Sequence, residues 1–255
     1  MPQSAIYPTL ANKTVFITGG GSGIGAAHTM AFAAQKAKVA FVDIAEAESQ
    51  ALVAKVAAET GHRPTFIRCD IRDIDALRAA IERTRRELGD IGVLVNNAAH
   101  DQRHKIAEVT VAEWDDRMAV NLRPMFFAAQ TVAPQMKRLG GGSIVNFSSI
   151  SWVVKSGDLP VYNTAKAAVF GLTRSLAREL GAHNIRVNTV SPGWVMTERQ
   201  MKLWLTPEAD AIRAASQCLP ARIAPEHLAD MAVFLASDAS AMCSAQNFVV
   251  DGGWS

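Results

Sequence analysis

Short apolar runs rich in β-branched residues alternate along this chain with longer segments in which apolar residues recur every three or four positions. The short runs hold four or five mostly apolar residues, as expected for strands buried on both faces of a parallel sheet. We predict seven such strands, at Thr14–Thr18, Lys38–Val42, Thr65–Cys69, Val93–Asn96, Ser143–Phe147, Arg186–Val190 and Asn247–Val250.

The longer segments have the period of an amphipathic helix. Thr110 and Glu113 have the spacing of a capping box before one of them. Strands that alternate with helices predict an α/β fold: a single Rossmann-type doubly wound sheet of seven parallel strands, with helices on both faces and one domain over residues 1–255. The predicted helices are Ile24–Gln35, Ala45–Glu59, Ile74–Leu88, Ala112–Met136 and Glu226–Ala236.

Composition narrows the class of protein. The chain of 255 residues is 49% hydrophobic and 20% charged, and its net charge of +2 gives no reason to expect nucleic acid or an anionic membrane as a partner. Three scattered cysteines favour a reducing compartment. The first residues have no signal-peptide pattern and no apolar run is long enough to cross a membrane, so we expect a cytoplasmic protein.

A glycine-rich loop directly follows the first predicted strand and opens the first helix. Its sequence is Gly19-Gly20-Gly21-Ser22-Gly23-Ile24-Gly25. Glycines in such a loop allow a tight turn and close approach of the backbone to a pyrophosphate, and the helix N-terminus offers free N–H groups. A glycine cluster can also be an ordinary loop, but its place between strand and helix favours a nucleotide site.

An acidic residue ends the second strand. Asp43 lies eighteen residues after Gly25, where a carboxylate can accept hydrogen bonds from both ribose hydroxyls of NAD and would repel the 2′-phosphate of NADP. No Arg or Lys flanks it or lies in the glycine loop. A turn residue at a strand end is the alternative, but the pattern favours NAD as the cofactor.

The candidate base is Tyr162, four positions before Lys166. Residues at i and i+4 share a helix face, so the ammonium can lie near the phenol and lower its pKa from about 10 toward neutrality. A phenolate can then remove the proton of an alcohol. Ser149 lies thirteen positions before Tyr162, at the end of a predicted strand. The spacing alone is a weak signal, and taken by itself an ordinary helix face is the better interpretation.

Together these motifs resemble the short-chain dehydrogenase/reductase family over nearly the whole chain. Further matches are Asn96-Asn97-Ala98-Ala99 after the fourth strand and Pro192-Gly193 after the sixth. The resemblance implies that Asn121, Ser149, Tyr162 and Lys166 are catalytic, and it implies a homotetramer. It also implies that the cofactor is held by Gly19, Ser22, Gly23, Ile24, Gly25, Asp43, Ile44, Asp70, Ile71, Asn97, Ala98, Tyr162, Lys166, Pro192, Gly193, Val195 and Thr197.

Two positions bear on this resemblance in opposite ways. Ala99 replaces the usual glycine, and its Cβ could crowd the backbone beside the cofactor. Pro124 falls inside the predicted helix Ala112–Met136, where it removes an N–H and should kink the helix close to Asn121. A local rule broken inside a strong helix often marks a functional site, so Pro124 supports the role of Asn121.

A closer resemblance is to bacterial short-chain aldose 1-dehydrogenases, which act on pentoses such as D-xylose or L-arabinose. It implies NAD-dependent oxidation at C1 of a pentose or 6-deoxyhexose to the aldonolactone. The alternatives are an NAD(H)-dependent carbonyl reductase or alcohol dehydrogenase of the 3-oxoacyl or hydroxysteroid type, and a catalytically silent NAD-binding scaffold. The resemblance to aldose 1-dehydrogenases is carried by the stretches Ala5-Ile6-Tyr7-Pro8, Arg103-His104-Lys105, Trp114-Asp115, Asn121-Leu122-Arg123, Ser149-Ile150-Ser151-Trp152 and Gln217-Cys218-Leu219.

Ligands of such sheets bind beyond the carboxyl ends of the strands. We expect a helical, mobile lid over the sugar at residues 196–219, with Thr206 capping one of its helices. His100 and His104 have i, i+4 spacing, but without a third ligand we expect no metal site. The predicted substrate contacts are His100, Ser149, Ser151, Trp152, Tyr162, Trp194 and Arg199.

Overall fold

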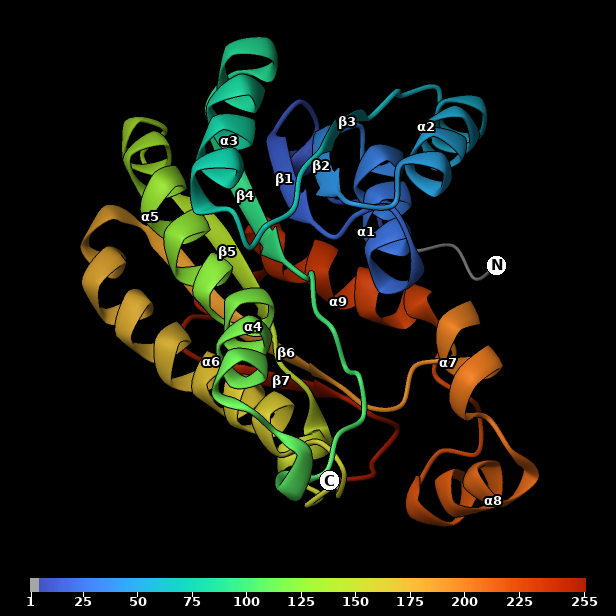
Figure 1. Ribbon diagram of the computed structural model, residues 1–255. Coiled ribbons are helices and arrows are strands. Elements are labelled where there is room, and N and C mark those ends of the chain that lie inside the picture. Colours follow the sequence, from blue (N-terminus) through green and yellow to red (C-terminus); the bar gives the residue numbers. More distant parts are fainter. Residues whose placement is uncertain (1–4) are drawn as a thin grey trace.

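The computed structural model describes residues 5–255 and contains the predicted sheet (Figure 1). Seven parallel strands lie in the order β3-β2-β1-β4-β5-β6-β7, so the predicted fold class is confirmed. The opening residues 1–4, which bear on the expected lack of a signal peptide, lie outside this range. The strands are β1 (Thr14–Thr18), β2 (Lys38–Asp43), β3 (Thr65–Arg68), β4 (Ile91–Asn96), β5 (Gly142–Phe147), β6 (Ile185–Pro192) and β7 (Asn247–Val250).

Helices cover both faces of the sheet (Figure 1). Successive side chains of a strand point to opposite faces. On β1, Val15 and Ile17 therefore join a core with helices α1, α2 and α9, while Phe16 joins the core on the other face with α3, α5 and α6. The bounds are α1 (Gly23–Ala34), α2 (Glu46–Thr60), α9 (Pro225–Ala236), α3 (Ile74–Leu88), α5 (Arg123–Arg138) and α6 (Pro160–Leu180).

The chain reverses its direction of winding between β1 and β4. It first builds outward from β1 to β3 and then returns to place β4 on the other side of β1. The Thr18 hydroxyl at the end of β1 accepts hydrogen bonds from the N–H groups of Asn97 (3.1 Å) and Ala98 (3.2 Å) beyond β4. A crevice opens at such a switch point, beyond the carboxyl ends of the strands.

The single helix predicted over Ala112–Met136 is wrong. The structure has two helices, α4 (Val111–Asn121) and α5, separated at Leu122, whose φ of −138° and ψ of −54° are not helical. Pro124 lies in the first turn of α5, where its missing N–H has no helical partner to lose. The proline therefore starts a helix instead of kinking one. The capping box of Thr110 with Glu113 is confirmed at the start of α4.

The segment after β6 is helical, as predicted. It forms α7 (Glu198–Trp204) and α8 (Pro207–Ser216), which lie beyond the carboxyl edge of the sheet (Figure 1). Thr206 caps α8, because its hydroxyl accepts a hydrogen bond from the N–H of Ala209 at 3.2 Å. That this segment moves as a lid stays a prediction.

Two kinds of feature are missing from residues 5–255. None of the helices there combines the length and the apolar character that crossing a bilayer requires. No three His, Cys, Asp or Glu side chains of that range gather in a way that could hold a metal ion.

A neutral histidine belongs to the core beneath the glycine loop. His28 on α1 packs against Phe147 of β5 with ring centroids 4.7 Å apart, and neither ring nitrogen has a hydrogen-bond partner among residues 5–255. Burial lowers the pKa of His28 to about 3. The ring therefore stays uncharged at neutral pH and acts as a core aromatic.

This histidine makes stability depend on pH. The unfolded chain binds the proton near pH 6.5, whereas folded His28 does so only near pH 3. Its contribution to stability is therefore complete above pH 6.5 and is lost as pH falls, by about 2 kcal/mol at pH 5. In His28→Leu, the fall in unfolding free energy between pH 8 and 5, measured by urea denaturation, should be smaller by that amount. His62→Gln, at an exposed position, is the control. The same pH dependence in wild type and His28→Leu would contradict this assignment.

Candidate active site

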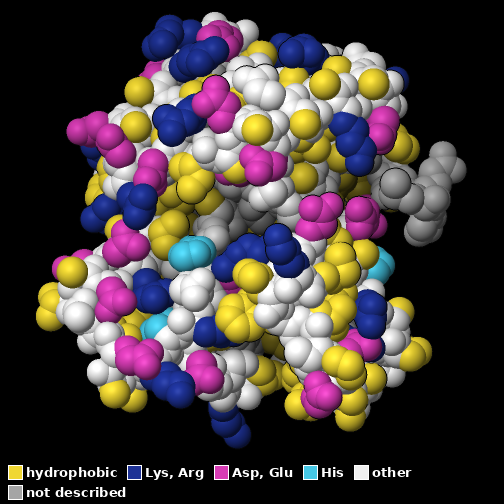
Figure 2. Space-filling view, turned by 45° about the vertical axis from the view of Figure 1, so that its right-hand side comes forward, with side chains coloured by type: hydrophobic (Ala, Val, Ile, Leu, Met, Phe, Trp, Pro, Cys, Tyr) yellow, Lys and Arg dark blue, Asp and Glu magenta, His cyan; other side chains and the backbone are white. Residues whose placement is uncertain are grey.

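The carboxyl edge of the sheet opens onto a cavity of about 980 Å³, seen as a hollow across the face shown in Figure 2. Nearly all residues predicted to bind cofactor or substrate line it. Gly23, Asn121 and Trp152 do not. The predicted residues that line the cavity are Gly19, Ser22, Ile24, Gly25, Asp43, Ile44, Asp70, Ile71, Asn97, Ala98, His100, Ser149, Ser151, Tyr162, Lys166, Pro192, Gly193, Trp194, Val195, Thr197 and Arg199.

The glycine loop leaves no room for side chains. Gly19 has φ +66°, and a Cβ there would lie 2.8 Å from the Cα of Ala98. A Cβ at Gly25 would lie 1.8 Å from the Gly19 carbonyl oxygen. Asn97 fixes this approach by donating a hydrogen bond to the same carbonyl at 2.9 Å. The loop is thus a tight backbone cradle at a helix N-terminus, which fits the pyrophosphate of a dinucleotide.

Ala99 replaces the family's glycine without strain. It lines the cavity, and its φ is not positive, so the backbone does not require glycine there. The expectation that its Cβ could disturb the loop finds no support in the backbone.

Carboxylates lie at the ends of β2 and β3. Asp43 accepts hydrogen bonds from the N–H groups of Gly21 (2.8 Å) and Ala45 (3.0 Å), which fix its carboxylate beside the glycine loop. Asp70 is paired with Arg72 through contacts of 2.6 to 3.1 Å, and these hydrogen bonds hold the pKa of Asp70 below its usual value. Arg72 lines this end of the cavity, and its charge is therefore already paired with a carboxylate.

Ser149, Tyr162 and Lys166 converge at the other end. Ser149 follows β5, while the other two lie on α6, buried on one face of that helix. The Lys166 Nζ donates a hydrogen bond to the Phe147 carbonyl at 2.8 Å and lies 5.7 Å from the centroid of the Tyr162 ring. The i, i+4 spacing thus brings the two side chains together as expected.

Burial dominates the titration of this pair. It raises the pKa of Tyr162 above its ordinary value, and the Asp101 carboxylate raises it further, while Ser149, Arg103 and Arg199 act to lower it. Burial also lowers the pKa of Lys166 to about 7. The sequence predicted that Lys166 lowers the pKa of Tyr162. In the protein alone, the effect of burial on that pKa is larger.

Asn121 supports the site from behind. Its Oδ1 accepts a hydrogen bond from the N–H of His100 at 2.9 Å. Its Nδ2 donates to the carbonyls of His100 (3.2 Å) and Arg117 (3.0 Å). The Asn121 amide therefore fixes the loop after β4 to the end of α4. The helix breaks at Leu122, directly after Asn121.

His104 has a structural position that the sequence did not indicate. It is buried, with its Nδ1 2.9 Å from the Gln102 carbonyl, and its Nε2 accepts a hydrogen bond from the N–H of Val161 at 3.1 Å. It thereby satisfies a free N–H at the start of α6, the helix that carries Tyr162. Both ring nitrogens are occupied, and the side chain ties the start of α6 to the loop after β4.

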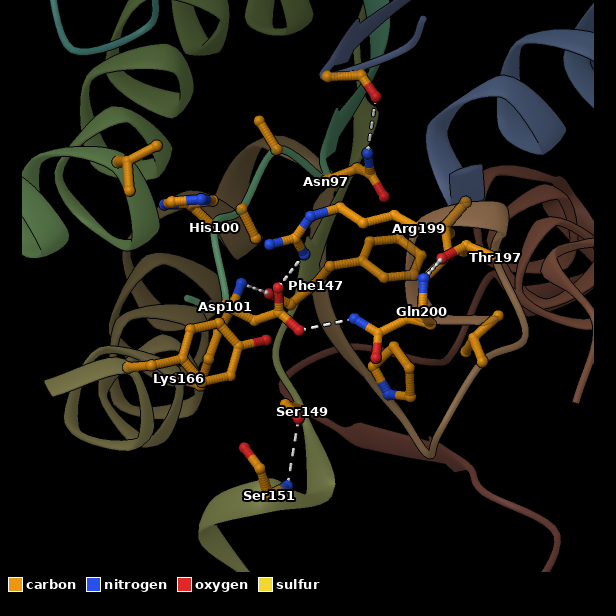
Figure 3. A pocket seen from close by; sticks show the side chains of 18 of the residues that line it. Asn97, His100, Asp101, Phe147, Ser149, Ser151, Lys166, Thr197, Arg199 and Gln200 are labelled. Carbon is orange, nitrogen blue, oxygen red and sulfur yellow. Dashed lines mark hydrogen bonds and ion pairs between the residues drawn. The ribbon is translucent and has the colours of Figure 1, made fainter. Parts of the chain in front are cut away.

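Sequence reasoning also missed a polar network centred on Asp101 (Figure 3). Its carboxylate accepts hydrogen bonds from Arg199 and from Gln200 (2.7 Å) of α7, and it pairs with Arg103 at 3.2 Å. Trp194 donates to the Gln200 side chain at 3.0 Å. This end of the cavity is therefore walled by charged and amide groups.

Two of the residues that line this end each carry a polar group without a partner among residues 5–255. They are the Ser151 hydroxyl and the indole N–H of Trp204, both buried. A buried donor without a partner costs free energy unless a ligand or water satisfies it.

Over residues 19–255 the sequence matches the family described as Enoyl-(Acyl carrier protein) reductase. It is 52% identical over 250 residues to the probable galactose dehydrogenase GalD of Rhizobium meliloti (strain 1021), with 98% of each chain covered. It is also 52% identical over 252 residues to the D-xylose 1-dehydrogenase of Caulobacter vibrioides (strain NA1000 / CB15N), with 99% of each covered. The chain belongs to the short-chain dehydrogenase/reductase family. The predicted family is thus confirmed, and this member is an oxidoreductase whose relatives are dehydrogenases.

Solved structures of this family superpose closely on the chain. A 7α-hydroxysteroid dehydrogenase complexed with NADH and 7-oxo glycochenodeoxycholic acid has a TM-score of 0.91 at 31% identity, covering 97% of this chain and 96% of its own. A blue fluorescent protein from a metagenomic library, in complex with NADPH, has a TM-score of 0.88 at 33% identity, covering 97% and 99%. Nicotinamide cofactors are therefore common to the family, and the choice between NAD and NADP depends on residues of the individual member.

Proposed function

We propose that this protein oxidises an aldose at C1 to the aldonolactone, with NAD as the hydride acceptor and Tyr162 as the general base. The observation that carries the proposal is the polar wall at the substrate end of the cavity. There Asp101, Arg199 and Gln200 lie together, and two buried polar groups lack partners. The relatives named as galactose and D-xylose 1-dehydrogenases support the same substrate class.

The wall suits a pentose or a 6-deoxyhexose better than an apolar alcohol. Hydroxyls can exchange hydrogen bonds with a carboxylate, a guanidinium and an amide, whereas a steroid offers few such partners and would leave these groups paired only with one another. The indoles of Trp194 and Trp204 line the same cavity and offer faces to the C–H groups of a sugar.

The cofactor residues fit a dinucleotide with an unphosphorylated ribose. The glycine cradle has no space for a Cβ at Gly19 or Gly25 and would hold the pyrophosphate. Asp43, fixed by the backbone of the loop, would accept hydrogen bonds from the adenosine ribose hydroxyls. When bound, NAD supplies the hydride-accepting ring and one positive charge.

Each remaining step belongs to the protein's own residues. Ser149 would hold the C1 oxygen beside Tyr162, which removes the hydroxyl proton. Burial opposes loss of the proton from the Tyr162 phenol. The phenolate therefore forms only when positive charge close to it stabilises it. Lys166 contributes to that charge, and its pKa of about 7 lets it give up or take a proton near neutrality. Asn121 fixes the loop that forms the opposite wall.

We expect NAD to be preferred over NADP by at least about tenfold in kcat/KM, since a 2′-phosphate beside Asp43 should cost more than about 1.4 kcal/mol. Asp43→Asn combined with Ile44→Arg should shift the preference toward NADP. Asparagine keeps an acceptor for the Gly21 N–H, and position 44 is 63% exposed at the cavity edge, so the loop should survive. Steady-state kinetics with both cofactors measure this, with Ile44→Arg alone as the control. Equal efficiency of the wild type with the two cofactors would refute the role given to Asp43.

The proposal extends to assembly and compartment. An apolar groove of about 350 Å³ lies on the outer side of α4, α5 and α6, with Phe126 42% exposed. A homotetramer would cover this groove, and light scattering would measure the oligomeric state. All three cysteines are free, as in a cytoplasmic protein.

The substrate proposal is tested by a panel of pentoses, hexoses, 6-deoxyhexoses and apolar secondary alcohols with NAD. We expect the highest kcat/KM for a pentose or a 6-deoxyhexose. Higher efficiency with an apolar alcohol would favour a reductase of the hydroxysteroid type.

A further inference from the structure

Asp101 joins two segments that are far apart in the sequence. It lies in the loop between β4 and α4, and both of its carboxylate oxygens face α7 (Figure 3). Oδ1 accepts a hydrogen bond from the Arg199 guanidinium, and Oδ2 accepts one from Gln200 at 2.7 Å. The side chain is only 18% exposed, so the ion pair with Arg199 is partly shielded from water. Hydrogen bonds of this charge-assisted kind are among the strongest that side chains make.

Helix α7 has little else to hold it. It is seven residues long and none of its residues is buried. A helix this short is unstable without tertiary contacts. Its further tie to the same loop is a cation–π contact, with the Arg103 guanidinium 4.6 Å from the Trp204 ring centroid. Arg103 is itself paired with Asp101, so both ties depend on one carboxylate.

The same carboxylate acts on the catalytic tyrosine. Charged groups that face Tyr162 come from three elements: Asp101 and Arg103 from the loop after β4, Arg199 from α7, and Lys166 from α6. Asp101 raises the pKa of Tyr162, and the two arginines lower it. The ion pair between Asp101 and Arg199 therefore places opposed charges near the phenol while it holds α7 to the loop after β4.

We propose that Asp101 is a positioning residue that latches α7 over the substrate end of the cavity, and that substrate enters when this latch opens. The role rests on the proposed oxidation at this site. Sugar hydroxyls can take the place of the Arg199 and Gln200 donors on the Asp101 carboxylate. The free energy needed to open the latch is therefore lower with a polyol than with an apolar alcohol. The latch therefore contributes to the choice of substrate class.

The first test needs no substrate. Hydrogen exchange of the amides of residues 198–204 is compared in wild type, Asp101→Asn and Arg199→Gln. We expect exchange at least about tenfold faster in both variants, because each loses the charge-assisted contact. Arg199 has a side chain that is 42% exposed, so its variant should fold even if Asp101→Asn does not. Exchange within twofold of wild type in Arg199→Gln would overturn the latch.

Asp90→Asn is the matched control. Asp90 immediately precedes β4 at the opposite edge of the sheet and forms an ion pair with Arg138 at 2.8 Å, far from the cavity lining. The substitution removes one carboxylate and one ion pair, yet exchange in α7 should match the wild type. Faster exchange in this variant would show a general loss of stability and would overturn the assignment to Asp101.

The second test separates charge from packing. Removing the negative charge in Asp101→Asn should shift the pH profile of kcat/KM to lower pH, and removing the positive charge in Arg199→Gln should shift it to higher pH. A merely structural role would move both profiles alike or neither, and either result would overturn the proposal. The profile is measured with whichever alcohol of the panel is turned over, so failure of the sugar assignment leaves both tests readable.

Discussion

Tyr162→Phe should lose about 10³-fold in kcat while its affinity for NAD stays within about twofold of wild type. The substitution keeps the ring, which is buried on α6, and removes only the oxygen that accepts the substrate proton. NADH formation measures kcat, and fluorescence titration with NADH measures cofactor affinity.

Tyr7→Phe is the matched control for this prediction, since Tyr7 is the other tyrosine of the chain. Its ring packs near Phe234, with centroids 6.5 Å apart, and it does not line the cavity. The same oxygen atom is removed there, so kcat should not change. If Tyr162→Phe kept more than a few per cent of wild-type turnover, another base would be required and the mechanism would be wrong.

Lys166→Met should reduce both turnover and NAD affinity, by about 10²-fold and about tenfold. The substitution preserves the length of the buried side chain but removes its charge and its hydrogen bond to the Phe147 carbonyl. The loss of charge leaves the Tyr162 phenol harder to ionise. The loss of the donor frees the end of β5, next to the cavity wall formed by Ser149.

Kinetics and NADH titration measure these two effects, and circular dichroism establishes that the variant is folded. Lys38→Met, at an exposed position on the opposite edge of the sheet, is the control and should leave both quantities unchanged. Normal NAD affinity in Lys166→Met, together with turnover within tenfold of wild type, would show that the lysine has neither role.

The sheet was predictable because its signals are local. Buried strands are short apolar runs, and the glycine loop between β1 and α1 has a fixed place in the sequence. The break at Leu122 was not predictable, because the residues on both sides of it favour helix and a proline is compatible with either a kink or a new first turn. Only tertiary structure decides between these two conformations.

The site was predictable to the extent that it follows the strand ends. Ser149, Tyr162 and Lys166 converge because one strand and one helix carry them. The contacts of Asp101 had little signal in the sequence, since its partners Arg199 and Gln200 are about a hundred positions away and lie on a helix outside the sheet. Its place directly after the Asn97 loop was the one available hint. The titration of Tyr162 was equally hidden, because burial is a property of the folded state.

Oxidation of an aldose at C1 is tested most directly by a measurement that follows that carbon. D-Xylose and L-arabinose labelled with ¹³C at C1 are incubated with the enzyme and NAD, and the carbon spectrum is recorded while NADH is quantified. We expect the C1 signal of the sugar to be replaced by that of a lactone carbonyl, with one NADH formed for each lactone, and no such change with Tyr162→Phe. Robust turnover of apolar alcohols with no change at C1 of either sugar, or of labelled D-galactose, would contradict the claim.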